Sequence, residues 1–211
     1  MNLQAATTRR PKARLTAEQR REVLLHAAAE VFCLRGYHGA SIAEIAERAR
    51  ITKPVIYHHF ASKRALHSAV FAHYSELLLA AAAERGRAPT LCGALSDVVL
   101  AMFDFAHENP EAWQLLLGDS SDPETARLQQ QLREAGTRFA ASRLLSEPGF
   151  HSAARLGRET TATVIAQLTR SAVDGLVDWS LRNPSVSRAR LAGIATDLLW
   201  SGLVGYNAPS D

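Results

Sequence analysis

The segment Thr52–His59 gathers residue types that bind nucleic acid into one short stretch. Four of its side chains are hydrogen-bond donors: Thr52, Lys53, Tyr57 and His58. Helical spacing would bring Thr52, Lys53 and Tyr57 within reach of one another. Such a cluster can contact base edges and phosphates in a major groove. A half-buried aromatic side chain is the alternative interpretation of Tyr57.

The positive charge of the chain is concentrated around this segment. Residues 1–66 carry 12 Lys+Arg against 5 Asp+Glu, a net charge of +7, whereas residues 67–211 carry −4 of the total of +3. This asymmetry indicates an anion-binding head on a neutral-to-acidic body, with a chance fluctuation of surface charge as the alternative. Arg10 and Arg14 lie in a basic arm, which either contacts phosphates and the minor groove or forms a solvated tail.

The eight histidines and the carboxylates form no recognisable catalytic or metal-binding pattern. His-Glu-x-x-His, Cys-x-x-Cys, Gly-x-Ser-x-Gly and a Gly-rich phosphate loop are all absent. His58 and His59 would point to different sides of a helix. Asp104 and His107 have the spacing of a di-metal helix but lack the glutamate partners that such sites need. We therefore predict no metal, no cofactor and no enzymatic activity, with a helical-bundle enzyme as the distant alternative.

The length and composition are those of an ordinary globular protein. The 211 residues, 47% hydrophobic and 21% charged, suffice for one large or two small domains. No apolar stretch reaches the length of a bilayer span, and no secretory signal pattern opens the chain. Cys33 and Cys92 each lie in an apolar helical pattern and are predicted to be reduced core residues. We expect a soluble cytoplasmic protein without a membrane partner.

Almost every periodic segment has the helical period, and no Val/Ile/Thr alternation indicates a sheet. In the first helix, Val23, Ala27, Val31 and Leu34 form one apolar stripe that ends before Gly36. Ser41 and Glu44 match a capping box at the start of the second. The expected helices span about 17–35, 41–48, 52–59, 62–85, 90–108, 110–117, 123–145, 158–182 and 187–205. We predict an all-α fold of about nine helices.

The second and third helices are joined by only Ala49, Arg50 and Ile51. A turn this short holds two helices at a steep angle, as in a helix-turn-helix, so the helix after it can enter a major groove. Val55 and Ile56 are apolar and are expected to anchor that helix on the core of the head.

The same region is similar to a known family. The pattern reads Ala27-Ala28-x-x-x-Phe32-x-x-x-Gly36-Tyr37-x-x-x-Ser41-Ile42-x-x-Ile45-Ala46-x-x-Ala49, then Ile51-Thr52-Lys53-Pro54-Val55-Ile56-Tyr57-x-His59-Phe60-x-Ser62-Lys63-x-x-Leu66. It resembles the DNA-binding domain of the tetracycline-repressor-like (TetR) family, without a gap over roughly 21–66. Three residues depart from the family pattern: Ala40 where Thr is frequent, Arg50 where Gly is common, and Arg64 where Glu is usual. Arg50 would be less comfortable than Gly in a left-handed backbone, and it might instead touch phosphate.

The resemblance implies a dimeric transcriptional regulator, usually a repressor that a ligand releases from DNA. We divide the chain into a DNA-binding domain at 1–66, comprising the arm and a three-helix helix-turn-helix unit, and a helical ligand-binding and dimerisation domain at 67–211. The expected DNA-binding residues are Arg10, Arg14, Ser41, Thr52, Lys53, Pro54, Tyr57, His58, His59 and Lys63. Because a two-fold dimer presents two identical recognition helices, we expect a palindromic operator in double-stranded DNA.

By the same resemblance, a ligand pocket lies among the helices of the second domain, where aromatic residues are abundant. The expected lining comprises Met102, Phe103, Trp113, Leu117 and Phe139, with His107, Gln131 and Gln167 as polar anchors. Plain core packing is the alternative interpretation of these residues. The implied effector is a small, largely apolar or amphipathic molecule.

Two C-terminal helices carry more apolar surface than contact with their own subunit requires. One stripe comprises Val164, Leu168, Ala172, Gly175 and Trp179, and the other Leu191, Ala195, Leu198, Gly202 and Tyr206. We expect Ala172, Gly175, Trp179, Leu198 and Gly202 to lie in the homodimer interface, a four-helix bundle that the resemblance also implies. The alternative is that these stripes pack on the ligand-binding core. A family member that activates transcription, or that takes no small-molecule inducer, is the alternative function.

Overall fold

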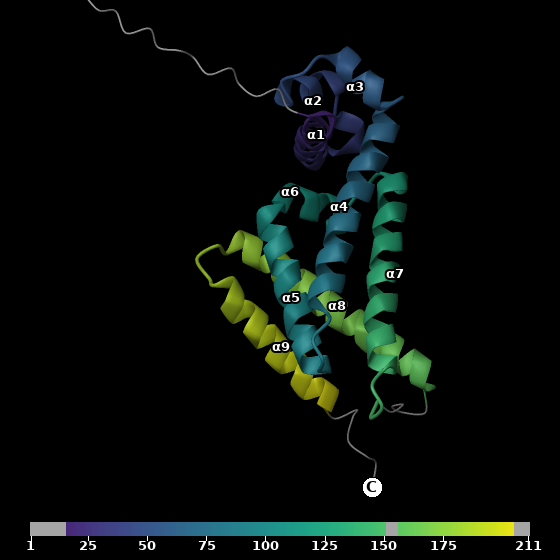
Figure 1. The fold of residues 1–211 in the computed structure, drawn as a ribbon, viewed down its shortest axis with the longest axis vertical. Helices are drawn as coiled ribbons and strands as arrows, with labels where there is room; N and C mark the ends of the chain where they lie inside the picture. Colours follow the sequence, from purple (N-terminus) through teal and green to yellow (C-terminus); the bar gives the residue numbers. More distant parts are fainter. Residues whose placement is uncertain (1–15, 151–155, 205–211) are drawn as a thin grey trace, which may run out of the picture.

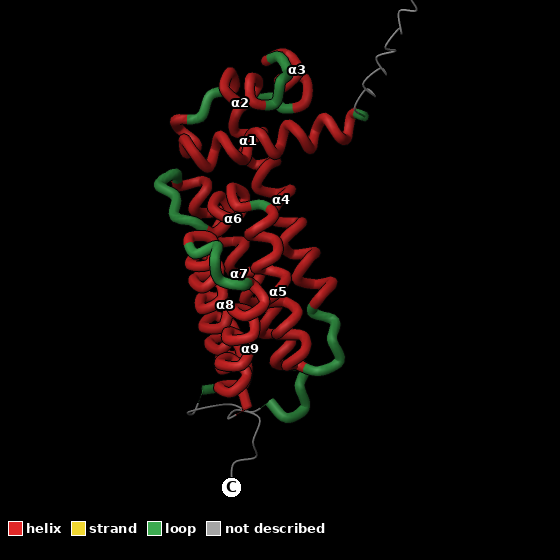
Figure 2. The backbone as a smooth tube through the Cα atoms, turned by 90° about the vertical axis from the view of Figure 1, so that its left-hand side faces the viewer, coloured by secondary structure: helices red, strands yellow, loops and turns green. Residues whose placement is uncertain are grey.

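The computed structural model describes residues 16–150 and 156–204, and within those ranges every regular element is an α-helix (Figures 1 and 2). The predicted all-α class is confirmed. The nine helices are α1 (Ala17–Gly39), α2 (Ile42–Arg48), α3 (Lys53–His59), α4 (Lys63–Arg85), α5 (Leu91–Glu108), α6 (Pro110–Leu117), α7 (Pro123–Leu145), α8 (Arg158–Arg182) and α9 (Arg188–Val204). Arg10, Arg14 and Tyr206 lie outside the described residues.

The helix starts are fixed by side-chain caps. Thr16 and Gln19 form a reciprocal capping box at α1, and Ser62 and Thr90 accept backbone N–H bonds at α4 and α5. At α2 only half of the predicted box forms. Ser41 Oγ accepts from the Glu44 N–H at 3.1 Å, whereas the Glu44 carboxylate pairs with Arg35 Nε at 3.1 Å.

The first helix is interrupted where the sequence predicts its end. Gly36 has φ +66°, a left-handed conformation that costs glycine little, and one helical turn follows it to Gly39. Two residues of the predicted apolar stripe are not core: Leu34 is 67% exposed and Val23 is 43% exposed. Cys33 is also exposed and Cys92 is half-buried, so the prediction that both are core residues is wrong. These side chains lie beyond the arc of α1 that the neighbouring helices cover.

We call α1, α2 and α3 the head, and α5 to α9 the body. In Figure 2, α1 lies across the top of the body with α2 and α3 above it. Leu25, Ala28, Ile45 and Ile56 are fully buried and belong to one core cluster that continues into the body. Val55 is 37% exposed, so Ile56 alone, and not Val55 with it, anchors α3 as predicted.

The helix α4 joins the two parts because its N-terminal end packs on α1 and its C-terminal half packs on α5 (Figure 1). The body packs α7 against α8 and α5 against α9, around the buried side chains of Phe103, Trp113 and Leu116. No helix among the described residues is long and apolar enough to cross a bilayer.

Candidate DNA-binding surface and ligand cavity

The helix α3 presents a polar surface at the end of the molecule away from the body (Figure 1). Ile56 is its one fully buried side chain. The predicted DNA-binding residues of this helix and its N-cap are all exposed: Thr52, Lys53, Pro54, Tyr57, His58 and His59. Thr52 makes no side-chain cap bond, so its hydroxyl is available to a ligand. Tyr57 is 53% exposed, which favours a contact role over the half-buried alternative.

The turn before α3 holds a strained residue. Arg50 is exposed and has φ +55°, the only non-glycine residue of the described chain with a positive φ. The Ile51 N–H donates to the Ala46 carbonyl at 2.9 Å and closes the turn behind it. The departure from the usual glycine therefore falls where the backbone is left-handed.

Two other predicted DNA-binding residues are already hydrogen-bonded within the head. The Ser41 hydroxyl caps α2. Lys63 Nζ donates to the carbonyls of Tyr37 at 2.8 Å, Ala40 at 2.9 Å and His38 at 3.3 Å, and lies 4.7 Å from the centre of the Tyr37 ring. Because an ammonium group has three N–H donors, this arrangement uses all of them. Lys63 thus ties the start of α4 to the end of α1.

A cavity of about 160 Å³ lies in the body between α4, α5, α7 and α8. Its walls are almost entirely apolar, and they include Leu78, Leu79, Ala82, Leu91, Ala94, Leu95, Val98, Val99, Met102, Leu117, Leu132, Phe139, Ala140, Leu144, Ala166, Val173 and Leu203. Leu79 and Phe139 are partly exposed, so the cavity reaches the surface between α4 and α7. Such a cavity suits an apolar molecule or the apolar part of an amphipathic one.

Four charged residues also line this cavity: Arg133, Arg143, Arg170 and Asp174. Arg170 is hydrogen-bonded to Asp174 one helical turn away. Burial raises the pKa of Asp174 to about 6, although Arg170 and Arg133 act in the opposite direction. Asp174 Oδ1, Arg170 Nε and Arg143 Nε are buried without a hydrogen-bond partner among the described residues. Sequence reasoning missed these charges because an i, i+4 Arg–Asp pair is typical of a solvated helix face.

Both long walls of the cavity extend to the head. One wall, α4, begins at Lys63. The other, α7, begins at Asp122, whose Oδ1 lies 3.1 Å from His38 Nε2 and whose Oδ2 accepts from the Thr125 N–H at 2.8 Å. Thr125 Oγ1 in turn lies 3.4 Å from Nε2 of His67, a buried histidine whose pKa is lowered by burial. A change in the spacing of α4 and α7 would therefore be felt at the end of α1.

Comparisons with known proteins agree with this arrangement. The profile described as bacterial regulatory proteins, tetR family, matches residues 24–70. The chain is 29% identical over 193 residues to the HTH-type transcriptional activator FasR of Mycolicibacterium smegmatis, covering 90% of this chain and 85% of FasR. The chain belongs to the TetR family of transcriptional regulators. It is therefore a DNA-binding regulator and not an enzyme, as its family is non-enzymatic.

Solved structures share the whole fold. A TetR-like regulator from Rhodococcus sp. RHA1 superposes with a TM-score of 0.75 at 23% identity, covering 91% of this chain and all of that one. FadR from Bacillus subtilis, solved in complex with stearoyl-CoA, gives a TM-score of 0.70 at 17% identity and covers 86% of this chain and 98% of that one. The resemblance in the head thus extends through the body as a TetR fold.

Of the pocket residues predicted for this TetR chain, Met102, Leu117 and Phe139 line the cavity. Phe103 and Trp113 are fully buried core residues outside its lining, and the Trp113 Nε1–H donates to Asp178 Oδ1 at 2.7 Å. The geometry favours the core-packing alternative for this aromatic pair.

The three predicted polar anchors also lie outside the lining. His107 Nε2 lies 3.1 Å from Ser180 Oγ, and burial lowers the pKa of this histidine. Gln131 is exposed on α7. Gln167 is exposed on α8, where its Oε1 accepts from the Thr137 hydroxyl at 3.0 Å. The polar groups that the cavity does hold come instead from arginine and aspartate.

All five residues predicted for the dimer interface are exposed in the single chain: Ala172, Gly175, Trp179, Leu198 and Gly202. On α8 the whole predicted stripe is exposed, including Leu168 at 65%. On α9 the stripe divides, because Leu191 and Ala195 are buried against their own body whereas Leu198 is 71% exposed and Ile194 is 55% exposed. We call the exposed set Val164, Leu168, Ala172, Gly175, Trp179, Ile194, Leu198 and Gly202 the α8/α9 face.

Proposed function

We propose that this TetR regulator binds a palindromic operator as a homodimer and that a small, largely apolar molecule in the cavity controls that binding. The observation that carries the proposal is the cavity itself, whose two long walls, α4 and α7, both end on the head. A ligand that changes the spacing of these walls would reorient α3, because Lys63 and Asp122 connect them to the end of α1.

The α8/α9 face supports the homodimer. Isolated exposed leucines are ordinary on protein surfaces, but a continuous apolar face on two adjacent helices marks an interaction surface. A Cβ atom added to Gly175 or Gly202 would meet nothing within 4 Å, so a partner helix can approach closely at both positions. Pairing each helix with its symmetry mate would form a four-helix bundle. This assignment divides the chain near residue 66, with DNA binding before it and ligand binding and dimerisation after it.

The proposed base-reading residues are Thr52 and Tyr57, with Lys53 as a phosphate contact. The test is selection of binding sites from random duplexes, followed by affinity measurements on the selected and a scrambled site. Tyr57→Ala should weaken the selected site by about tenfold more than the scrambled one, since a base contact is worth roughly 1–3 kcal/mol of discrimination. Equal losses on both duplexes, or a selected site without inverted symmetry, would contradict the assignment.

The ligand is proposed to release the operator, as in a repressor. An activator is the alternative that one observation favours, because FasR, a relative along most of the chain, is named an activator. A reporter downstream of the selected site separates the two. A repressor gives higher expression when its own gene is deleted, and an activator gives lower expression.

The apolar lining and the stearoyl-CoA complex of FadR, a protein of the same fold, support an effector with a hydrocarbon chain. An apolar cavity of about 150 Å³ holds a benzene-sized molecule, so about 160 Å³ is enough for part of such a chain. A screen of amphipathic compounds for release of the selected duplex tests this. Release by polar metabolites alone would contradict an apolar effector.

A further inference from the structure

The cavity contains more positive than negative charge, although its walls are otherwise apolar. Three arginines, Arg133, Arg143 and Arg170, line it against one carboxylate, Asp174. Arg170 pairs with that carboxylate. Across residues 16–150 and 156–204, neither Arg133 nor Arg143 has an acidic side chain within 4.0 Å. An unpaired buried cation is costly, so such a cavity favours an anion.

Arg143 is the least satisfied of the three. The Arg133 Nη2–H donates to the Leu117 carbonyl at 2.7 Å, and Arg170 Nη1 donates to Asp174. The side chain of Arg143 has no hydrogen-bond acceptor in the described part of the chain, and its Nε is buried. A carboxylate bound there would gain two parallel charge-assisted bonds without displacing an existing one.

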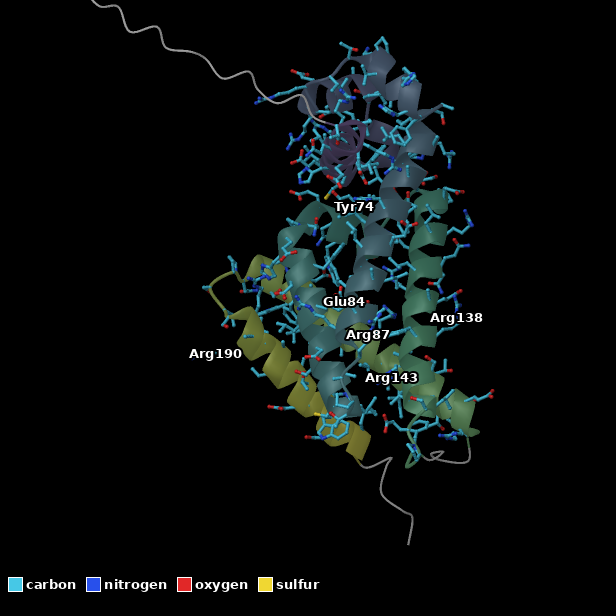
Figure 3. The ribbon with its side chains drawn as sticks, viewed as in Figure 1. Tyr74, Glu84, Arg87, Arg138, Arg143 and Arg190 are labelled. Atoms are coloured by element: carbon cyan, nitrogen blue, oxygen red, sulfur yellow. The ribbon has the colours of Figure 1, made fainter. Side chains whose placement is uncertain are left out.

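The cavity is elongated along α7. Arg143 lies near the lower end of that helix in Figure 3, and Arg133 and Leu117 lie toward its other end. The ten residues from Arg133 to Arg143 correspond to about 15 Å of helix. Between these levels the cavity wall contains Phe139 and Ala140, with only apolar side chains from α5 facing them. The cavity can therefore hold an extended chain with its charged group at Arg143.

We propose that the effector is an amphipathic carboxylate of the medium-chain fatty acid class, with its carboxylate on Arg143 and its hydrocarbon chain along α7 toward Leu117. This assignment rests on the proposed ligand response and narrows it to one chemical class. Arg143 is a recognition residue, and the Arg170–Asp174 pair forms a polar patch beside the chain.

The experiment measures binding to the full-length protein by isothermal titration, with sodium decanoate as the probe and decanol as its neutral counterpart. Decanoate should bind at least about tenfold more tightly than decanol. Arg143→Met should weaken decanoate by about tenfold or more and leave decanol unchanged, while Arg143→Lys should retain part of the preference. Arg138→Met is the matched control, because Arg138 lies on the same helix with its side chain 72% exposed, outside the cavity (Figure 3). Thermal unfolding confirms that each variant is folded.

Equal affinity for decanoate and decanol, or an Arg143→Met variant that binds decanoate normally, would overturn the assignment. Equal losses of both probes in Arg143→Met would overturn it too, since they would indicate a structural role. Decanoyl-CoA that binds more tightly than decanoate and depends on Arg143 would place a phosphate there in place of a carboxylate. If decanol alone binds and releases the operator, the proposed ligand response holds and only the carboxylate fails. If no amphipathic compound binds or releases the operator, the ligand response itself fails.

Discussion

The head and the body direct their charged side chains in opposite directions. On α3 one buried residue, Ile56, lets Lys53 and its polar neighbours face outward. In the body, Arg143 and Arg170 face inward onto an apolar cavity. An outward cluster depends only on the spacing within one helix. An inward cluster depends on which helices surround it, and that is decided by contacts between segments far apart in the sequence.

The apolar surfaces are reversed in the same way. The exposed end of the head is polar, whereas the α8/α9 face of the body is apolar. The outer surfaces thus suit different partners, an anionic duplex for the head and a second copy of the chain for the body. The two functions remain coupled, because two heads reach two half-sites only when the bodies hold them at a fixed spacing.

The largest expected effect comes from breaking the body while leaving the head intact. Leu198→Asp places a charge in the α8/α9 face, where dimerisation would bury it without a partner at a cost of several kcal/mol. We expect a monomer by sedimentation and at least about a hundredfold loss of operator affinity. Leu77→Asp is the matched control, because Leu77 is a 45% exposed leucine on α4 away from that face. A Leu198→Asp variant that is still dimeric and operator-bound would mean that the interface lies elsewhere; Gly202→Glu provides an independent second test.

This contrast explains how much the sequence could predict. The helix order, the turn before α3 and the exposed residues of α3 follow from local spacing and capping, and the structure agrees with them. The cavity was only partly predictable. Met102, Leu117 and Phe139 line it, but Trp113 and Phe103 are core residues because α8 and the neighbouring helices enclose them. Amphipathic spacing identifies a buried face without showing whether that face meets a cavity or another side chain.

Charged residues mislead for the same reason. Asp174 and Arg170 have the spacing of a solvated pair, yet α7 covers both. Lys63 stands at a helix start, where a phosphate contact was expected, but the preceding turn offers it three carbonyls. In neither case does the sequence near the residue name the partner.

The second prediction concerns the buried carboxylate. Because the pKa of Asp174 rises from its ordinary 3.8 to about 6, the folded chain holds this proton more tightly than the unfolded chain. The stabilisation is fully present below about pH 4 and is lost as the pH rises through 6, on the order of 3 kcal/mol in all. In urea denaturation, Asp174→Asn should therefore lose less stability than the wild type between about pH 4.5 and pH 7. Asp97→Asn, at an exposed position of α5, should follow the wild type. Parallel curves for wild type and Asp174→Asn would show that this carboxyl titrates normally.

The third prediction separates an outward lysine from an inward one within the head. Lys53→Ala should lower the slope of log affinity against log salt by about one unit, as expected for one lost phosphate contact, and leave stability nearly unchanged. Lys63→Ala should leave that slope unchanged and lower the free energy of unfolding by about 1–3 kcal/mol, because three carbonyls lose a charged donor. The measurements are a salt titration of operator affinity and chemical denaturation. A reduced salt slope in Lys63→Ala would restore it as a phosphate contact.

The smallest expected effect lies in the turn that positions α3. Arg50 adopts φ +55°, where a side chain costs roughly 1–2 kcal/mol and glycine costs little, although glycine loses about 0.5–1 kcal/mol in chain entropy. Arg50→Gly should therefore be more stable than Arg50→Ala by up to about 1 kcal/mol, since both lose the guanidinium and only the alanine variant keeps the strain. Chemical denaturation of the two variants measures that difference. Operator affinity of the same pair then tests the charge. If Arg50 touches phosphate, both variants bind more weakly than the wild type and by the same factor. If Arg50→Gly is no more stable than Arg50→Ala, the left-handed turn imposes no strain, and the departure from glycine at this position is neutral for the head.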